Sequence, residues 1–481
     1  MKRLFALQKR FVLLALAAVT LTHYSFSLDA QATTGAGRKT DPQQTARAMG
    51  ADIPPKVSEY MDALVKAGWF SGSILIAQNG KVLASKGYGM ANLELEVPNT
   101  PQTKFRVGSI TKVFTAIAIM LLQERGKLSL QDPICKYVAD CPASWQPITI
   151  HHLLSHTSGL AKHDTAGVYL KTAMLPMTLS QLIESFKNKP ADFQPGEKFD
   201  YNNNGYILLG QVIEKVSGQS YEAFLKENIF MPLKMANSGY DNHDPIIKNR
   251  AAGYRSEGTT LFNAAYIDQS QPFSAGALYS TTGDLLLLDQ ALNDGQFLSP
   301  KTQETMSTAV SGNYGYGWFV NKQFNRRAVA HPGGVPGFSA MITRFPDEKV
   351  LIVTLSNLEN SQIIRANNDL AAIVFGEKYE VPKRRTTVKV DRTILNTYVG
   401  EYEDRPGRIT RIFVDHDTLM LQLANTGIGK FDPIPMSAES DREFFDPLHD
   451  TQVAFVKDAG GQVIEMVLKI NGREFHAKKI K

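Results

Sequence analysis

The chain is poor in cysteine: its 481 residues contain only two, Cys135 and Cys141, with five residues between them. Two cysteines this close in sequence leave two interpretations open. They pair as a local disulfide, which the oxidising conditions met by an exported protein would favour. Alternatively, they are two free thiols that pack as small apolar side chains. Internal repeats and low-complexity tracts are also absent from the sequence.

A strong excess of charge of one sign is missing as well. The formal net charge is +5. Removing the first 32 residues takes away four basic side chains and Asp29, which leaves a net charge of +2. A balance this close to neutral argues against nucleic acid or an anionic membrane surface as a partner.

The N-terminal segment has the pattern of a secretory signal peptide. Four basic side chains precede the apolar run 11–22, and Ala30-Gln31-Ala32 is a small-x-small cleavage site. The apolar run is shorter than the ~20 residues of a membrane-spanning helix, and no cysteine follows it that would carry a lipid anchor. We therefore predict a signal peptide over 1–32, export to the periplasm or the cell exterior, no integral membrane span, and a flexible polar leader over 33–55.

Strand-like runs stand at the two ends of the region that follows, and helical patterns fill its middle. The apolar run 73–77 is followed by Asn79-Gly80 and a second apolar run, which predicts a β-hairpin. Further strand-like runs lie between 317 and 355. This order predicts an α/β domain over 56–377, in which both ends of the domain supply one sheet and the middle forms a helical insertion.

The last hundred residues change in texture. Residues 378–391 are charged and contain proline, which predicts a linker. Short strand-like runs then follow one another over 392–481, and this length is enough for a small all-β barrel or sandwich. The sequence leaves the oligomeric state and the role of this C-terminal domain open.

Ser109 and Lys112 stand at the start of an apolar run, 113–122, that contains no glycine or proline. The run predicts a buried helix, and the two residues share one face of its first turn. Ser109 could be no more than an N-cap, but a capping box would place Glu or Gln three residues later. Lys112 instead meets the positive end of the helix dipole, which disfavours the charged amine and suits a general base.

Two other segments could complete a catalytic site. Tyr201-Asn202-Asn203 follows a Pro-Gly turn and precedes a helical pattern, so the phenol could point into a cleft and pass a proton. His331-Pro332-Gly333-Gly334 joins two strand-like runs, and its amides could donate to a developing oxyanion. The alternatives are a surface turn for Tyr201 and an ordinary turn for the glycines.

Taken in order, these three motifs resemble those of the penicillin-recognising serine hydrolases. The most similar branch is the class C β-lactamase-like group, which includes β-lactamases, D-amino-acid peptidases and esterases. The resemblance spans roughly 57–377 and includes two segments typical of the branch, 149–160 and 274–280. It implies an antiparallel sheet flanked by helices, and 398–481 resembles the lipocalin-like C-terminal domain often appended to this branch.

The resemblance also implies the chemistry. Ser109 would be the acylated nucleophile, Lys112 its general base, and Tyr201 the residue that shuttles the proton to the leaving group. The substrate would be a small molecule or a short peptide with an ester or amide bond, such as a D-peptide, a small ester or a β-lactam. No cofactor would be needed.

The remaining roles concern substrate binding. By the same resemblance Asn203 would be a ligand of the substrate or of the lysine, and the amides of Ser109 and Gly334 would form the oxyanion hole beside Gly333. His331 departs from the family pattern, in which a lysine at this position recognises a substrate carboxylate. A neutral histidine would bind such a carboxylate less well.

Three rival interpretations can be weighed from the sequence. His152 and His156 are four residues apart, but no His-Glu-x-x-His motif is present, so a metal site is not expected. An α/β-hydrolase is disfavoured because the sequence lacks Gly-x-Ser-x-Gly. A non-catalytic ligand-binding protein or penicillin sensor on the same fold stays an alternative, because fold alone does not establish activity.

Overall fold

The structure is a computed structural model. It describes residues 42–162, 172–242, 244–257, 260–295, 297–359, 361–383, 385–423, 433–446, 451–470 and 473–481. The segment expected to be a signal peptide, 1–32, lies outside the described residues, as does the first part of the expected leader. Among the helices that are described, none is both long and apolar enough to cross a membrane.

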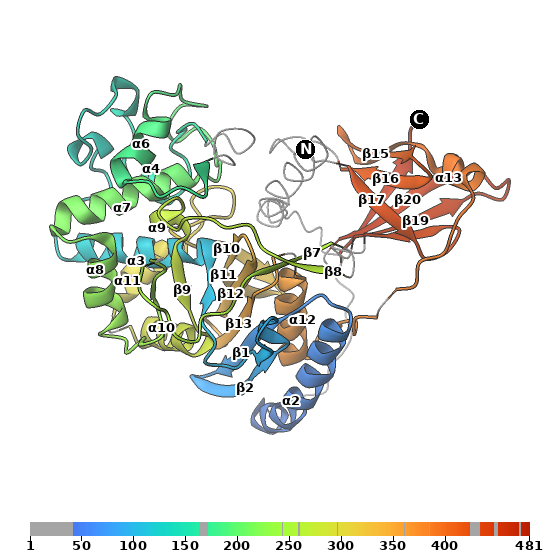
Figure 1. Cartoon of the computed structure of the whole chain (residues 1–481), viewed down its shortest axis with the longest axis horizontal. Coiled ribbons are helices and arrows are strands. Elements are labelled where there is room, and N and C mark those ends of the chain that lie inside the picture. The colour runs from blue at the N-terminus through green and yellow to red at the C-terminus, as the bar shows by residue number, and fades with distance from the viewer. Residues whose placement is uncertain are drawn as a thin grey trace.

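A six-stranded antiparallel sheet forms the centre of the larger domain (Figure 1). Its strands stand in the order β10-β11-β12-β13-β1-β2. Their bounds are β1 Gly72–Gln78, β2 Lys81–Tyr88, β10 Phe319–Gln323, β11 Arg326–Val335, β12 Phe338–Phe345 and β13 Val350–Ser356. The two ends of the domain therefore meet where β1 pairs with β13, as the sequence predicts. Asn79 and Gly80, with φ of 51° and 72°, make the expected tight turn between β1 and β2.

The inner strands β1, β12 and β13 are buried on both faces of this sheet, and successive side chains of each strand point to opposite faces. On β1, Ile74 and Ile76 face one core while Leu75 and Ala77 face the other. The first core contains helices α2 (Pro42–Lys66) and α12 (Ile363–Phe375). The second core contains the helices of the insertion. The result is a sheet between two helical layers, which is the fold class that the sequence predicts.

Helix α2 differs from the expected flexible leader over 33–55, because the helix already begins at Pro42. Ile53 is buried in the same core as Val57, Tyr60 and Leu64, so the apolar face of the helix extends into the segment that was expected to be a leader. The polar composition of 33–55 favours a flexible leader, whereas the structure has a helix that contains even Pro54 and Pro55.

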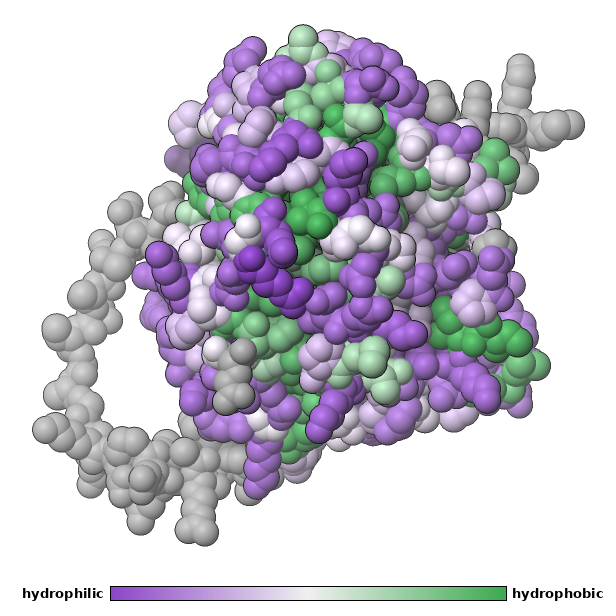
Figure 2. Space-filling model, turned by 90° about the vertical axis from the view of Figure 1, so that its left-hand side faces the viewer, coloured by the Kyte–Doolittle hydropathy of each residue, from purple (hydrophilic) through white to green (hydrophobic). Residues whose placement is uncertain are grey.

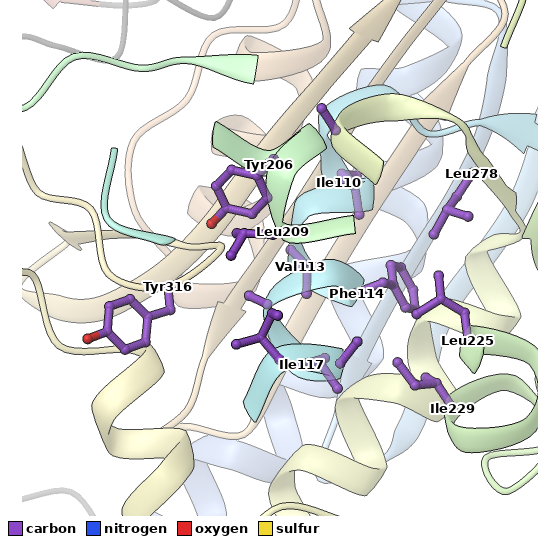
Figure 3. Close-up of a cluster of buried hydrophobic side chains, with 14 of the residues drawn as sticks. Ile110, Val113, Phe114, Ile117, Tyr206, Leu209, Leu225, Ile229, Leu278 and Tyr316 are labelled. Carbon is purple, nitrogen blue, oxygen red and sulfur yellow. The ribbon is translucent and has the colours of Figure 1, made fainter. Parts of the chain in front are cut away.

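The helical insertion lies between β2 and β10. Its helices are α3 Thr111–Glu124, α4 Ile150–Leu154, α6 Leu179–Lys187, α7 Asn203–Ser217, α8 Tyr221–Leu225, α9 Phe273–Gly276, α10 Thr282–Asp294 and α11 Pro300–Met306. Short single-turn helices are η2 Gly108–Ile110, η3 Ile134–Lys136, η4 Ala143–Trp145 and η5 Lys226–Phe230. Helix α3 runs through the middle of the apolar core: Figure 3 shows its side chains among residues of α7, α8 and β9.

Small sheets complete the insertion. Strands β5 (Phe105–Arg106), β9 (Leu278–Ser280) and β6 (Gly239–Tyr240) form a three-stranded sheet beside η2, and two short hairpins pair β3 (Met90–Asn92) with β4 (Val97–Pro98) and β7 (Tyr254–Glu257) with β8 (Thr260–Asn263). Figure 2 shows the helical side of the domain, where apolar side chains reach the surface in several separate places among polar ones.

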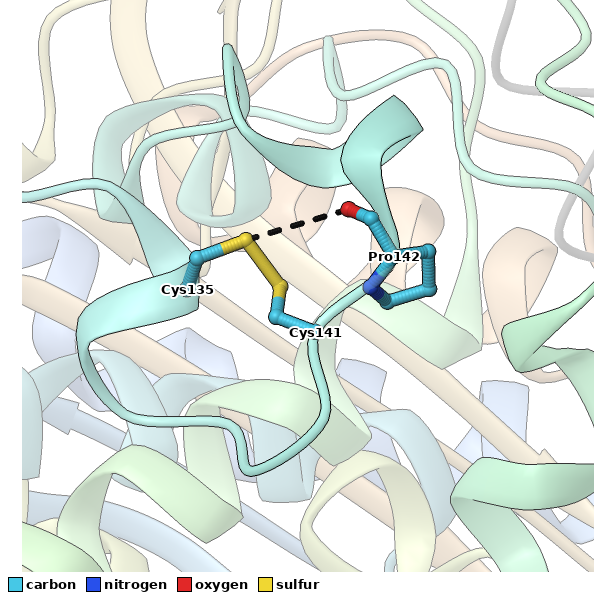
Figure 4. The surroundings of a disulfide bond; sticks show 3 residues. All are labelled: Cys135, Cys141 and Pro142. Carbon is cyan, nitrogen blue, oxygen red and sulfur yellow. Dashed lines mark hydrogen bonds between the residues drawn. A yellow bond between two sulfur atoms is a disulfide. The ribbon is translucent and has the colours of Figure 1, made fainter.

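Cys135 and Cys141 are joined by a disulfide, with Cα atoms 5.2 Å apart (Figure 4). The bond closes the short loop between η3 and η4. Cys135 and Cys141 are both partly buried against the core that contains α3. Of the two interpretations that the sequence left open, the structure has the local disulfide.

The C-terminal region is a closed eight-stranded antiparallel barrel. It follows helix α13 (Arg392–Tyr398) and consists of β14 Gly400–Arg405, β15 Arg408–Asp415, β16 Thr418–Gln422, β17 Ile434–Ala438, β18 Glu443–Phe445, β19 Gln452–Lys457, β20 Val463–Ile470 and β21 Arg473–Lys479. The barrel closes where β14 pairs with β21. In its core Tyr398 is stacked on Phe455, and among the described residues those of the core all come from 390 onward. The all-β prediction is confirmed, in its barrel form.

Candidate active site

The turn that carries Ser109 is a single 3-10 turn, η2, which leads directly into α3. Gly108 has φ +51°, a conformation that L-residues rarely adopt. The N-caps of η2 and α3 are Val107 and Ile110, and no side chain caps either helix. Ser109 is therefore not an N-cap, which removes the purely structural explanation for this serine.

Lys112 is the base expected beside Ser109, and its side chain is fully buried, with 0% of the residue exposed. Its Nζ lies 3.0 Å from Ser109 Oγ and donates to the carbonyl oxygen of Ala275 at 2.8 Å. The rings of Tyr201 and Tyr206 lie 4.9 and 5.7 Å from Nζ. Burial among these groups lowers the pKa of Lys112 well below that of a free lysine. A neutral amine next to the serine hydroxyl can accept its proton.

Tyr201 reaches the same site from the loop before α7. Its hydroxyl is buried and has no hydrogen-bond partner among the described residues. Burial raises the pKa of Tyr201, an effect that the Ser109 hydroxyl partly opposes, so the phenol stays protonated at neutral pH. The ring of Tyr201 packs against that of His156, with the two ring centroids 4.2 Å apart.

The three asparagines next to Tyr201 have different surroundings. Asn202 caps α7 by accepting from the amide of Asn204, and both side chains are buried. Asn203 is exposed. The partners of Lys112 are Ser109 and Ala275, so the structure does not place Asn203 as a ligand of the lysine. The other expected role of Asn203, contact with a substrate, stays a prediction.

Strand β11 brings two glycines against the serine turn. A Cβ on Gly333 would lie 2.0 Å from Val107 O and 3.2 Å from Ser109 N, and a Cβ on Gly108 would lie 2.5 Å from Gly334 N. Only glycine permits backbones to approach this closely. The amides of Ser109 and Gly334 were expected to form the oxyanion hole. They belong to two backbone segments that pack directly against each other.

His331 is fully buried rather than open to a cleft. Its Nδ1 lies 2.6 Å from the Pro332 carbonyl oxygen, which can only accept, so Nδ1 carries the proton. Burial is the main cause that lowers the pKa of His331 to about 3. The ring is therefore neutral, and its Nε2 accepts from the Tyr314 hydroxyl at 3.1 Å. Position 331 of β11 offers no cation to a substrate.

Three residues of the site were not found from the sequence alone. Ala275 binds Lys112 through its backbone carbonyl, which leaves no mark on residue type. Tyr314 comes from a loop that showed no pattern. His156 was considered only as a metal ligand, whereas its Nδ1 accepts from the Asn202 amide at 3.1 Å. His152 likewise serves its own helix, since its Nδ1 accepts from the Thr149 amide.

No group of three or more His, Cys, Asp or Glu side chains in the described part of the chain is arranged to hold a metal ion. The titratable groups gathered at Ser109 are instead an amine, phenols and a neutral imidazole. Such groups move protons.

A Ser-x-x-Lys pair at a helix start, with its lysine fully buried and facing a glycine-rich strand of an antiparallel sheet, defines a serine hydrolase of the β-lactamase and penicillin-binding-protein type. Residues 57–374 match the family model described as Beta-lactamase, and this match covers more than half of the chain. The chain belongs to the Beta-lactamase family.

Relatives agree with this assignment. The chain is 32% identical over 392 residues to penicillin-binding protein 4* of Bacillus subtilis (strain 168), covering 74% of this chain and 84% of the relative. It is 29% identical over 312 residues to the teichoic acid D-alanine hydrolase of Staphylococcus aureus, covering 63% of this chain and 75% of that one. The structure of the octameric penicillin-binding protein homologue from Pyrococcus abyssi superposes with a TM-score of 0.63 at 26% identity, over 88% of this chain and 99% of the other.

Proposed function

We propose that the protein is an exported serine hydrolase that cleaves an ester or amide bond through an acyl-enzyme on Ser109. The observation that carries the proposal is the fully buried Lys112, whose Nζ lies 3.0 Å from Ser109 Oγ. A neutral amine has two N–H groups and one lone pair. One N–H is taken by the Ala275 carbonyl, so the lone pair can face the serine hydroxyl.

In acylation, Ser109 Oγ attacks the carbonyl carbon of the substrate while its proton passes to Lys112. The amides of Ser109 and Gly334 donate to the carbonyl oxygen as it becomes negative. Tyr201, which stays protonated because burial raises its pKa, gives its proton to the leaving oxygen or nitrogen. The proton on Lys112 then restores Tyr201.

Deacylation repeats these steps with water. The water loses a proton to the Lys112–Tyr201 pair and adds to the acyl carbon. Collapse of the second tetrahedral intermediate returns the proton to Ser109 Oγ and releases the acid.

The neutral, buried His331 favours substrates that carry no carboxylate at its position, such as neutral esters and aminoacyl esters or amides. The relative named for hydrolysis of D-alanine from teichoic acid makes D-alanyl esters a natural member of this group. Export is supported by the N-terminal sequence pattern and by the Cys135–Cys141 disulfide.

A panel of substrates tests the proposal. We expect wild-type protein to turn over at least one of p-nitrophenyl acetate, a D-alanyl ester, a D-amino-acid amide and nitrocefin, and Ser109→Ala to lose that turnover while keeping its thermal unfolding transition. The alternative, a ligand-binding or penicillin-sensor protein, predicts one stoichiometric acylation of Ser109 without turnover. Neither acylation nor turnover with any probe would contradict both.

A further inference from the structure

A cluster of ion pairs stands directly behind the nucleophile turn. Arg106, three residues before Ser109, donates from Nε to Asp241 Oδ2 at 2.5 Å. Arg250 pairs with the other oxygen of the same carboxylate. The Asp241 side chain is fully buried, while those of Arg106 and Arg250 are 14% and 30% exposed. No step of the proposed mechanism uses these three side chains.

The backbone connects this cluster to the support of the lysine. Arg106 lies on β5, opposite Tyr279 of β9. The amide of Asp241 donates to the carbonyl oxygen of Ala277 at 2.8 Å. Ala277 stands two residues after Ala275, which holds Lys112. The segment that binds the lysine therefore runs through Ala277, which accepts from the Asp241 amide, into β9, which pairs with the strand of Arg106.

Arg106 also contacts the β11–β12 hairpin. Its guanidinium carbon lies 5.8 Å from the ring centroid of Phe338, within range of a cation–π contact. Phe338 pairs with Val335 at the closed end of the β11–β12 hairpin, next to Gly334. A single residue thus contacts, through its side chain, the hairpin that supplies the Gly334 amide, and stands at the end of β5, just before the η2 turn that carries Ser109.

We propose that Arg106 is a positioning residue that holds the amides of Ser109 and Gly334 at the spacing an oxyanion requires, with Asp241 fixing the plane of its guanidinium. The inference rests on the proposed function, because it takes Ser109 as the nucleophile. Arg250 shares the carboxylate from another side, beside Lys104, and serves as the matched control.

The test compares Arg106→Lys, Arg106→Gln and Arg250→Gln in the full chain. Each variant is assayed for p-nitrophenyl acetate hydrolysis, for thermal unfolding, and for the rate at which a fluorophosphonate labels Ser109. In labelling, the bond between Ser109 Oγ and phosphorus forms, the phosphorus–fluorine bond breaks, and the serine proton passes to Lys112. The phosphonyl oxygen occupies the place of the oxyanion, so the labelling rate reports on the two amides.

We expect both Arg106 variants to lower kcat and the labelling rate by about 10²-fold with KM little changed, since small displacements at a reacting centre have effects of this size. Arg106→Lys keeps the charge but loses the planar group, so it should resemble Arg106→Gln. Arg250→Gln breaks an ion pair to the same carboxylate and should lower kcat less than about threefold, because it does not move the hairpin.

Equal losses of kcat in the Arg106 and Arg250 variants would overturn the inference, since they would show a general structural role of the cluster. So would an effect on KM alone, or wild-type kinetics in folded Arg106→Lys. Should Arg106→Gln fail to fold, Arg106→Lys decides. A wild-type protein that is not labelled at Ser109 contradicts the proposed function instead, and the two failures are therefore distinct.

Discussion

Lys112 Nζ donates to the carbonyl oxygen of Ala275 at 2.8 Å, which joins residues that are 163 positions apart in the chain. The contact ties the first turn of α3 to α9 and directs the amine at Ser109. It also explains how a lysine can be buried without a carboxylate partner: the backbone carbonyl satisfies one N–H, and burial lowers the pKa of Lys112, which favours the uncharged amine.

The first prediction concerns pH. The base must be neutral, so activity rises as pH increases through the pKa of the Lys112–Tyr201 pair, to which the apparent value belongs. Because burial lowers the pKa of Lys112, this rise should end well below the ~10.4 of a free lysine. Because burial raises the pKa of Tyr201, no fall should follow below about pH 10. The pH dependence of kcat/KM measures both limbs, and a midpoint at the value of free lysine would contradict the account.

The second prediction separates the base from its charge. Lys112→Arg keeps a cation but cannot accept a proton, because a guanidinium does not lose its charge in proteins. We expect turnover to fall by about 10³-fold or more, the upper part of the range for general-base catalysis. Stopped-flow acylation with p-nitrophenyl acetate makes the measurement. Wild-type turnover with an unchanged pH profile would make Lys112 a structural residue and leave Tyr201 as the base.

The third prediction compares two glycines, Gly108 and Gly126, that both have a positive φ. Gly108 has φ +51° and Gly334 N would stand 2.5 Å from an added Cβ, whereas Gly126 has φ +66° and open space around it. Both Gly108→Ala and Gly126→Ala suffer the strain of a positive φ, about 1–2 kcal/mol. Only Gly108→Ala should also displace β11 and lower kcat, by about 10²-fold.

Chemical denaturation together with kcat for each alanine variant provides the comparison. If both variants kept full activity, close contact between the Ser109 turn and β11 would not matter for the reaction.

The fourth prediction concerns the C-terminal barrel. Within the described part of the chain, the barrel core and the two cores of the larger domain share no residue. Contacts between the barrel and the preceding segment, such as the bond from the Val388 amide to the Ala438 carbonyl, involve the expected linker 378–391. A chain that ends at Glu377 should therefore unfold in one cooperative transition and keep its ester hydrolysis. Loss of folding or turnover would show that the barrel completes the catalytic domain.

Local patterns explain what the sequence could predict. Ser109 and Lys112 are three residues apart on the continuous helical segment that η2 and α3 form, and Asn79-Gly80 forms the tight turn between β1 and β2. Short-range spacing is therefore enough to predict both features. Short apolar runs likewise predicted the strands that meet from the two ends of the domain.

Contacts between distant segments explain what the sequence could not predict. His331 is buried, which lowers its pKa, and it accepts from Tyr314, which enters the site from a loop without a pattern. Ala275 acts through a carbonyl that every residue has. Ile53 of α2 packs in a core that also contains residues of β13 and α12, from the far end of the domain.

The most direct test of the central claim is the mass of the protein after reaction with a fluorophosphonate, followed by peptide mapping. The account predicts one adduct per chain, located at Ser109, formed more slowly as pH falls below the pKa of the Lys112–Tyr201 pair, and absent from Ser109→Ala. An adduct on a different serine, or ester hydrolysis that persists in Ser109→Ala, would contradict it.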